Sequence, residues 1–212
     1  MDHAAEFAEV VRAAVEGDEA AFMWLYREVQ PGLLRYLRGL VGEDAEDVAS
    51  EAWLQIARDL RSYRGDGSGF KAWAATIARN RAFDHLRHSR RRPSVATPIE
   101  ALEGIAGLDD TEGRAMEAIE MRAVIDWIAA LPRDQAEAIL LRVVMGMDAE
   151  SAGNVVGKRA GAVRMAAHRG LRRLAEDLEH DPATGEPSRR PSKRSWLLAV
   201  TRRRPATPDG ER

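Results

Sequence analysis

The chain has 212 residues, of which 45% are apolar and none is cysteine. This length allows one or two compact domains, and the lack of cysteine excludes disulfides, thiolate metal sites and cysteine nucleophiles. The net charge of −2 hides a strong segregation, with −8 in residues 1–60, +7 in 61–92, −7 in 93–137, +2 in 138–179 and +4 in 180–212. Such segregation favours a protein that attracts polyanions at two places and repels them elsewhere, although chance clustering on solvated helix faces is an alternative.

Helical periodicity dominates the chain, and no segment alternates as a half-buried strand would. We therefore predict an all-α fold of two small helical domains joined by an acidic linker, the second being a helix-turn-helix domain. The expected ranges are 1–92, a linker at 93–114, 115–179, and a disordered tail at 180–212. Neither a membrane-length apolar run nor a basic-then-apolar signal segment is present, so we expect no membrane insertion and a cytoplasmic location.

An acidic helix is expected to begin near residue 43. Its acidic residues suit the positive end of the helix dipole, which by itself explains part of the cluster. Asp47, Glu51 and Gln55 repeat at one-turn intervals beside an apolar face. This acidic edge is suited to a basic protein partner.

A basic helix is expected from about Phe70 to His88, after a loop at 62–69 that holds three glycines. One stripe of this helix starts apolar and ends polar, with the residues Trp73, Ile77, Asn80, Asp84 and Arg87. Its polar end can face base edges while the arginines at 90–92 neutralise phosphates, and the loop can close around an unstacked base. The alternative is an ordinary amphipathic helix with a solvated end. A metal site at His85 and His88 is not favoured, because no cysteine or carboxylate pair accompanies them.

A helix-turn-helix is expected in the second domain. Pro132 opens a helix whose apolar face includes Ile139 and Leu140, and a short helix from about 149 to 156 follows. The turn at 157–159 leads into a long basic helix from about 161 to 179, which can enter a major groove. The alternative is a helical bundle with a basic outer face.

Together these segments resemble bacterial RNA polymerase sigma factors of the extracytoplasmic-function (ECF) type, over roughly residues 15–179. The resemblance rests on four landmarks that follow one another in order. They are Leu25-Tyr26 to Leu37, Asp44-Ala45-Glu46-Asp47-Val48 with Glu51 and Trp53, Phe70-Lys71-Ala72-Trp73 through Ile77-Ala78-Arg79-Asn80 to Arg87, and Leu131-Pro132 to Leu174.

The resemblance implies a role for each segment. Core RNA polymerase would be bound by Asp44, Glu46, Asp47, Glu51 and Gln55. The promoter −10 element would be bound by Tyr63, Arg64, Asn80, Arg81, Asp84, Arg87, His88 and Arg91, with the glycine loop holding a flipped base. The −35 element would be bound by Lys158, Arg159, Arg164, His168, Arg169 and Arg172. The linker would thread through polymerase toward the nascent RNA, and an anti-sigma factor is a further implied partner.

The chain departs from the family pattern in the helix-turn-helix. The sequence Ser151-Ala152-Gly153 stands where the family usually has Glu-Ile-Ala, and Ala166 replaces a usual basic residue. Gly153 is expected to weaken its helix by about 1 kcal/mol relative to alanine, and we expect weak or unusual −35 readout. For the tail at 180–212, one hypothesis is a regulatory or polymerase-contacting role, and the alternative is a dispensable disordered tail.

Two other classes of function agree less well with the sequence. A helix-turn-helix regulator that is not a polymerase subunit would leave the acidic helix and the stripe on the basic helix unexplained. An enzyme is not favoured, because the chain has no phosphate loop and no nucleophile constellation. We accordingly expect no catalysis, no cofactor, no metal and no small-molecule substrate.

Overall fold

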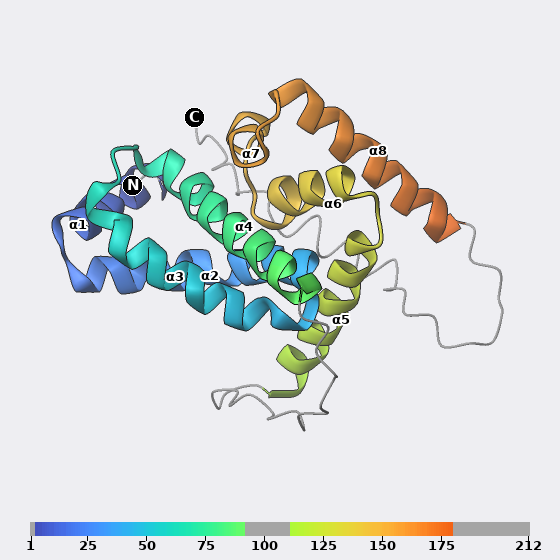
Figure 1. The fold of residues 1–212 in the computed structure, drawn as a ribbon, viewed down its shortest axis with the longest axis horizontal. Coiled ribbons are helices and arrows are strands. Elements are labelled where there is room, and N and C mark those ends of the chain that lie inside the picture. Colours follow the sequence, from blue (N-terminus) through green and yellow to red (C-terminus); the bar gives the residue numbers. More distant parts are fainter. Residues whose placement is uncertain (1–2, 92–110, 180–212) are drawn as a thin grey trace, which may run out of the picture.

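The computed structural model describes residues 3–91 and 111–179, and the regular elements in these ranges are all helices (Figure 1). The expected all-α fold is therefore confirmed. The expected tail and most of the expected linker lie outside the described residues. Helix α5 begins at Thr111, so that 111–114 are helical and not linker.

The first half of the chain holds four α-helices and two short 3₁₀ turns. They are α1 (His3–Glu16), α2 (Glu19–Val41), η1 (Gly42–Asp44), α3 (Ala45–Asp59), η2 (Leu60–Ser62) and α4 (Gly67–Arg91). Helix α4 begins three residues earlier than expected, so only residues 63–66 connect η2 to it.

Local signals explain where α2 begins and ends. The Asp18 carboxylate caps the helix by accepting a hydrogen bond from the Ala21 amide at 3.0 Å. At the other end Gly42 has a φ of +65°, which side chains rarely adopt, and its amide bonds to the Arg38 carbonyl. The short 3₁₀ turn η1 then leads into α3.

The core of this half is formed where α1 and α2 pack against α3 and α4. Phe70 is fully buried at the start of α4, with the Tyr63 ring 5.8 Å away and perpendicular to it, and Trp73 at 5.7 Å. Phe7 of α1 lies 6.3 Å from the same Phe70 ring. This aromatic cluster fixes the connection 63–66 against the body of the domain.

The second half holds four α-helices and a π-helical turn. They are α5 (Thr111–Ala129), α6 (Arg133–Ile139), the π-turn η3 (Leu140–Val144), α7 (Ala149–Val156) and α8 (Ala160–Glu179). Pro132 is the residue before the first turn of α6 and not its first helical residue. The predicted limits of α7 agree with the structure, and α8 begins one residue earlier than expected.

Two glycines shape the junction between α7 and α8 in different ways. Gly157 has a φ of +68°, the left-handed conformation of a helix C-cap. Gly153 is buried on α7, and a Cβ there would lie 2.4 Å from the Lys158 carbonyl oxygen. The expectation that Gly153 merely weakens its helix is therefore wrong, because any side chain would collide with the backbone of the turn.

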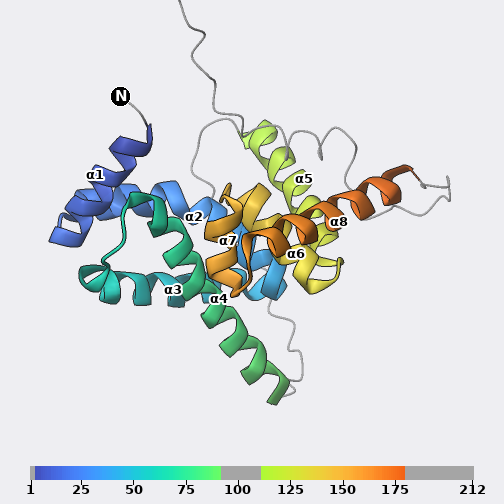
Figure 2. The same cartoon turned by 90° about the horizontal axis from the view of Figure 1, so that it is seen from above.

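The two halves pack directly on each other. Helix α7 lies against α4, while α5, α6 and η3 lie against α2, and Figure 2 shows the second half stacked on these two helices. Buried side chains from both halves form one continuous core. The approach is close, since a Cβ on Gly39 of α2 would lie 2.5 Å from a Leu140 methyl group.

Candidate nucleic-acid interface

The acidic edge expected on α3 is present and exposed. Asp47 and Glu51 lie on its surface, and within the described ranges neither makes a hydrogen bond or ion pair. Asp44 differs, because its carboxylate lies 3.0 Å from His85 Nε2 of α4, and Glu46 is 3.5 Å from Arg38. Two of the four expected carboxylates are thus free to meet a partner.

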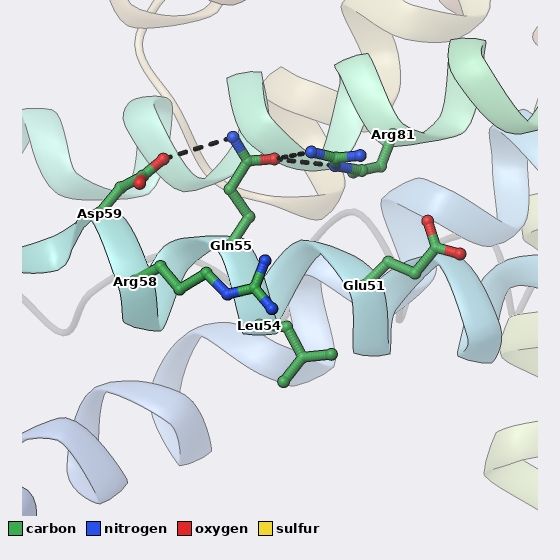
Figure 3. Close-up of a pocket in the computed structure, with 6 residues that line it drawn as sticks. All are labelled: Glu51, Leu54, Gln55, Arg58, Asp59 and Arg81. Atoms are coloured by element: carbon green, nitrogen blue, oxygen red, sulfur yellow. Dashed lines mark hydrogen bonds between the residues drawn. The ribbon is translucent and has the colours of Figure 1, made fainter.

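A hollow of about 440 Å³ lies beside this edge, between α3 and α4 (Figure 3). Gln55 lines this hollow, accepting a hydrogen bond from Arg81 Nε at 2.7 Å and donating one to Asp59 at 3.3 Å. Leu54 projects from the rim with 61% of its surface exposed. Leu54 was not among the residues expected from the sequence, and a single exposed leucine gives no signal there, because isolated apolar side chains are common on protein surfaces.

This arrangement separates Arg81 from the other residues expected to bind the −10 element. Its guanidinium points to Gln55 of α3, so the structure places it on the side of the expected protein-binding surface. The polar end of the α4 stripe lies elsewhere on the helix. Asn80 is exposed there, Asp84 pairs with Arg87, and His88 Nδ1 lies 2.9 Å from the Asp84 carbonyl.

Residues 63–66, which connect η2 to α4, are held in place by the buried side chain of Tyr63. Tyr63 is only 9% exposed, and its hydroxyl donates to the Asp66 carbonyl at 2.7 Å. Burial, followed by the nearby Asp66 carboxylate, raises the pKa of Tyr63 to about 12. Arg64 remains on the surface, beside a hollow of about 400 Å³ shared with α1. The structure therefore exposes Arg64, Gly65 and Asp66, while the Tyr63 ring acts as an anchor.

The basic face expected on α8 is exposed. The surface residues are Lys158, Arg159, Arg164, His168, Arg169 and Arg172. Two of them have acidic neighbours, since Arg169 lies 3.7 Å from Asp134 and Arg172 lies 2.7 Å from Glu176. Ala166 is buried on the opposite side, so that its position does not face outward as an expected DNA contact would.

A polar cluster between the two halves was not anticipated. The Arg79 guanidinium of α4 donates to both carboxylate oxygens of Glu137 on α6, at 2.8 and 3.3 Å. Tyr36 of α2 is fully buried with its hydroxyl 3.5 Å from the same carboxylate. The sequence signal was a single glutamate among the apolar residues 136–141. Within 3–91 and 111–179, no group of histidine and acidic residues could hold a metal ion, and no helix is long and apolar enough to cross a membrane.

Comparison with known proteins identifies the family to which this chain belongs. The model "Sigma-70 region 2" matches residues 25–92, and "Sigma-70, region 4" matches residues 121–174. The ECF RNA polymerase sigma factor SigD of Mycobacterium tuberculosis is 35% identical over 176 residues, covering 80% of this chain and 82% of the relative. The chain belongs to the ECF RNA polymerase sigma factors. The resemblance stated above is therefore confirmed.

Other members of the family are similar over the same part of the chain. The ECF sigma factor BldN of Streptomyces coelicolor is 33% identical over 179 residues, which cover 84% of this sigma factor and 67% of BldN. The solved structure of sigma factor RpoE with the anti-sigma factor NepR, from Bartonella quintana, matches at 25% identity with a TM-score of 0.57, covering 76% of this chain and 98% of that one.

Membership of this family establishes the broad role of the chain in transcription. It binds core RNA polymerase and promoter DNA and acts in transcription initiation. A free-standing helix-turn-helix regulator is not favoured, because the region 2 match covers the acidic helix and the basic helix that such a regulator would leave unexplained.

Proposed function

We propose that this sigma factor divides its tasks among three surfaces that the fold keeps apart. Core polymerase binds the exposed edge of α3 at Asp47, Glu51 and Leu54. The −10 element binds the exposed end of α4, where Asn80, Asp84 and Arg87 can reach base edges. The −35 element binds α8. The observation that carries this proposal is the contrast between the unpaired carboxylates on α3 and the exposed cations on α4 and α8.

Charge is the physical reason for this division. Phosphate binding by arginine and lysine supplies most of the affinity for DNA, and an acidic surface repels the same backbone. The acidic α3 edge therefore selects a protein partner with a basic surface, and the basic helices select DNA. The chain itself contributes no catalysis in this scheme, because polymerase makes the RNA. Since polymerase works in the cytoplasm, the activity belongs there.

In vitro transcription with purified core polymerase tests the function most directly. We expect initiation at specific promoters only when the sigma factor is added, and poor binding of promoter duplex by the sigma factor alone. Tight operator binding by the isolated chain, without any initiation in the presence of core polymerase, would favour the regulator class instead.

Readout of the −35 element is expected to be weak. Helix α8 begins with Ala160, Gly161 and Ala162, which offer no long side chains to the groove. Base discrimination needs side chains that reach base edges, so phosphate contacts dominate here. Scrambling −35 should then lower promoter affinity only modestly, and a loss of orders of magnitude would contradict this proposal.

An anti-sigma factor is a further proposed partner. The neighbour RpoE was solved with the anti-sigma factor NepR. Such a partner would inhibit by covering the α3 edge or the hollow at Gln55. Competition between a candidate anti-sigma factor and core polymerase for the sigma factor, measured by co-elution, would test this.

A further inference from the structure

Helix α8 carries one large apolar side chain on its surface. Met165 is 55% exposed, although the same helix buries Val163, Ala167 and Leu174 where it packs on α6 and α7. A single exposed apolar side chain is ordinary on a protein surface and by itself indicates nothing. The position of Met165, however, coincides with the part of α8 that we propose enters the groove of the −35 element.

Met165 lies at the centre of the outward face of α8. Successive residues of an α-helix are rotated by about 100° around its axis. Leu174 is nine positions further along and projects about 180° away from Met165, while Val163 and Ala167 are each two positions away and project about 160° from it. Figure 1 shows α8 along the outer edge of the second half, so its outward face is open to a partner. A helix that approaches DNA with this face presents Met165 to the bases.

The first turn of α8 lets DNA come close to the helix. Gly161 and Ala162 are exposed one turn before Met165, and a Cβ on Gly161 would meet nothing within 4 Å. In helix-turn-helix proteins the residues at the N-terminal end of the second helix are the ones that contact base edges. Because the side chains at 160–162 are small, Met165 is the first long side chain at the centre of this face that can reach the bases.

The charged side chains around Met165 are suited to the phosphate backbone. Arg164 is exposed but projects about 100° away from Met165, toward the flank of the helix. Arg169 and Arg172 follow one and two turns later on the outward face, and each already has an acidic neighbour. Hydrogen bonds to base edges from this face are therefore few, and an apolar contact at Met165 would supply base readout that the arginines do not.

An apolar side chain in the major groove has a defined target. Of the four bases only thymine presents a methyl group there, at C5, while the others are distinguished by their hydrogen-bond donors and acceptors. A thioether placed against those polar groups would displace water without replacing its hydrogen bonds, which is unfavourable. Methionine is also unbranched and flexible, so it can adapt its shape to the methyl group.

We propose that Met165 is a specificity-determining residue of α8, which reads the −35 element through the C5 methyl group of a thymine. The inference rests on the proposed function, in which α8 binds this element, and it names a base within an element where phosphate contacts otherwise dominate. Burial of one methyl group changes affinity only a few-fold. This size agrees with the weak −35 readout expected from the start of α8.

Replacing thymine by uracil tests the contact, because uracil pairs in the same way and lacks only the C5 methyl group. A promoter library randomised at both elements is first selected for initiation by the wild-type holoenzyme, and each thymine of the selected −35 element is then replaced singly by deoxyuridine. At one position the wild-type holoenzyme should bind about three- to fivefold more weakly. Met165→Ala should remove this difference between thymine and uracil, whereas Met165→Leu, which stays apolar, should keep it.

Met23→Ala on α2 is the matched control, because Met23 is also an exposed methionine, with 45% of its surface accessible. This variant should distinguish thymine from uracil as the wild type does. If Met165→Ala weakens binding equally on both promoters, the side chain contacts polymerase or the DNA backbone and the inference is overturned. A selected −35 element in which no thymine methyl group matters to the wild type would overturn it as well. If the wild-type holoenzyme initiates at no promoter of the library, the proposed function itself fails.

Discussion

Arg79 on α4 and Glu137 on α6 are 58 positions apart in the sequence, yet the guanidinium fork of one binds the carboxylate of the other at 2.8 and 3.3 Å. Burial lowers the pKa of Arg79, but the hydrogen bond and charge of Glu137 raise it by more, so the net direction is upward and the arginine stays charged. This pair joins the domain that matches sigma-70 region 2 to the domain that matches region 4.

Removing the carboxylate should destabilise the closed protein. Glu137→Ala leaves the partly buried Arg79 and the buried Tyr36 hydroxyl without their shared partner. We expect a loss of about 1.5–3 kcal/mol, the range for hydrogen bonds to charged groups. Urea unfolding followed by circular dichroism measures it. An unchanged midpoint would show that the pair contributes nothing net.

Asn80→Ala should impair promoter opening while core binding is retained. Asn80 is exposed on α4, so we expect its replacement to remove the proposed base contact and no structural one. A lost base contact costs about 1–3 kcal/mol, which we expect to see as a roughly 5- to 150-fold weaker open complex. Permanganate footprinting and co-elution with core polymerase give the two readouts. Equal loss of both would indicate misfolding.

Reversing the charge of the α3 edge should weaken binding of core polymerase. The double variant Asp47→Arg with Glu51→Arg turns two unpaired carboxylates into cations and is expected to lower the affinity by tenfold or more, about 1.4 kcal/mol. The matched control is Glu6→Arg with Glu9→Arg on α1, which makes the same change in net charge at exposed positions. Fluorescence anisotropy at two salt concentrations is suitable, since the difference should shrink as salt rises. Equal effects from both pairs would mean that only the overall charge matters.

Gly153→Ala should destabilise the second domain despite the higher helix propensity of alanine. The added Cβ would lie 2.4 Å from the Lys158 carbonyl oxygen in the turn before α8. Gly161→Ala is the matched control, because nothing lies within 4 Å of a Cβ at this exposed position. We expect the control to gain about 0.5–1 kcal/mol from propensity alone. Thermal unfolding should move in opposite directions for the two, and a stabilised Gly153→Ala would contradict the contact.

Asp148 should make the start of α7 sensitive to acid. Its carboxylate accepts hydrogen bonds from the amides of Ser151 and Glu150, both at 2.8 Å, and the Ser151 bond is the main cause of its lowered pKa. A lowered folded-state pKa means that the stabilisation is present above the unfolded-state pKa and lost as the pH falls through the folded value. Asp148→Ala should cost about 0.5–2 kcal/mol at neutral pH. The difference from wild type in urea unfolding should vanish in strong acid, and a pH-independent difference would exclude this cause.

The sequence by itself determined what depends on neighbours along the chain. Apolar periodicity marked the helices, Gly157 marked the turn after a helix, and the acidic stripe at 47–51 marked a surface, because each is a property of one helix and its end. The residues Asn80, Asp84 and Arg87 were placed on one exposed stripe for the same reason.

Only the tertiary structure decided which side chains meet across helices. It turned Arg81 toward Gln55, buried the Tyr63 ring, and made Gly153 obligatory, since each outcome depends on a contact with another segment. Above all it brought Glu137 to Arg79. A single glutamate in an apolar run does not indicate which residue it will pair with. The packing of the two domains on each other decides that partner.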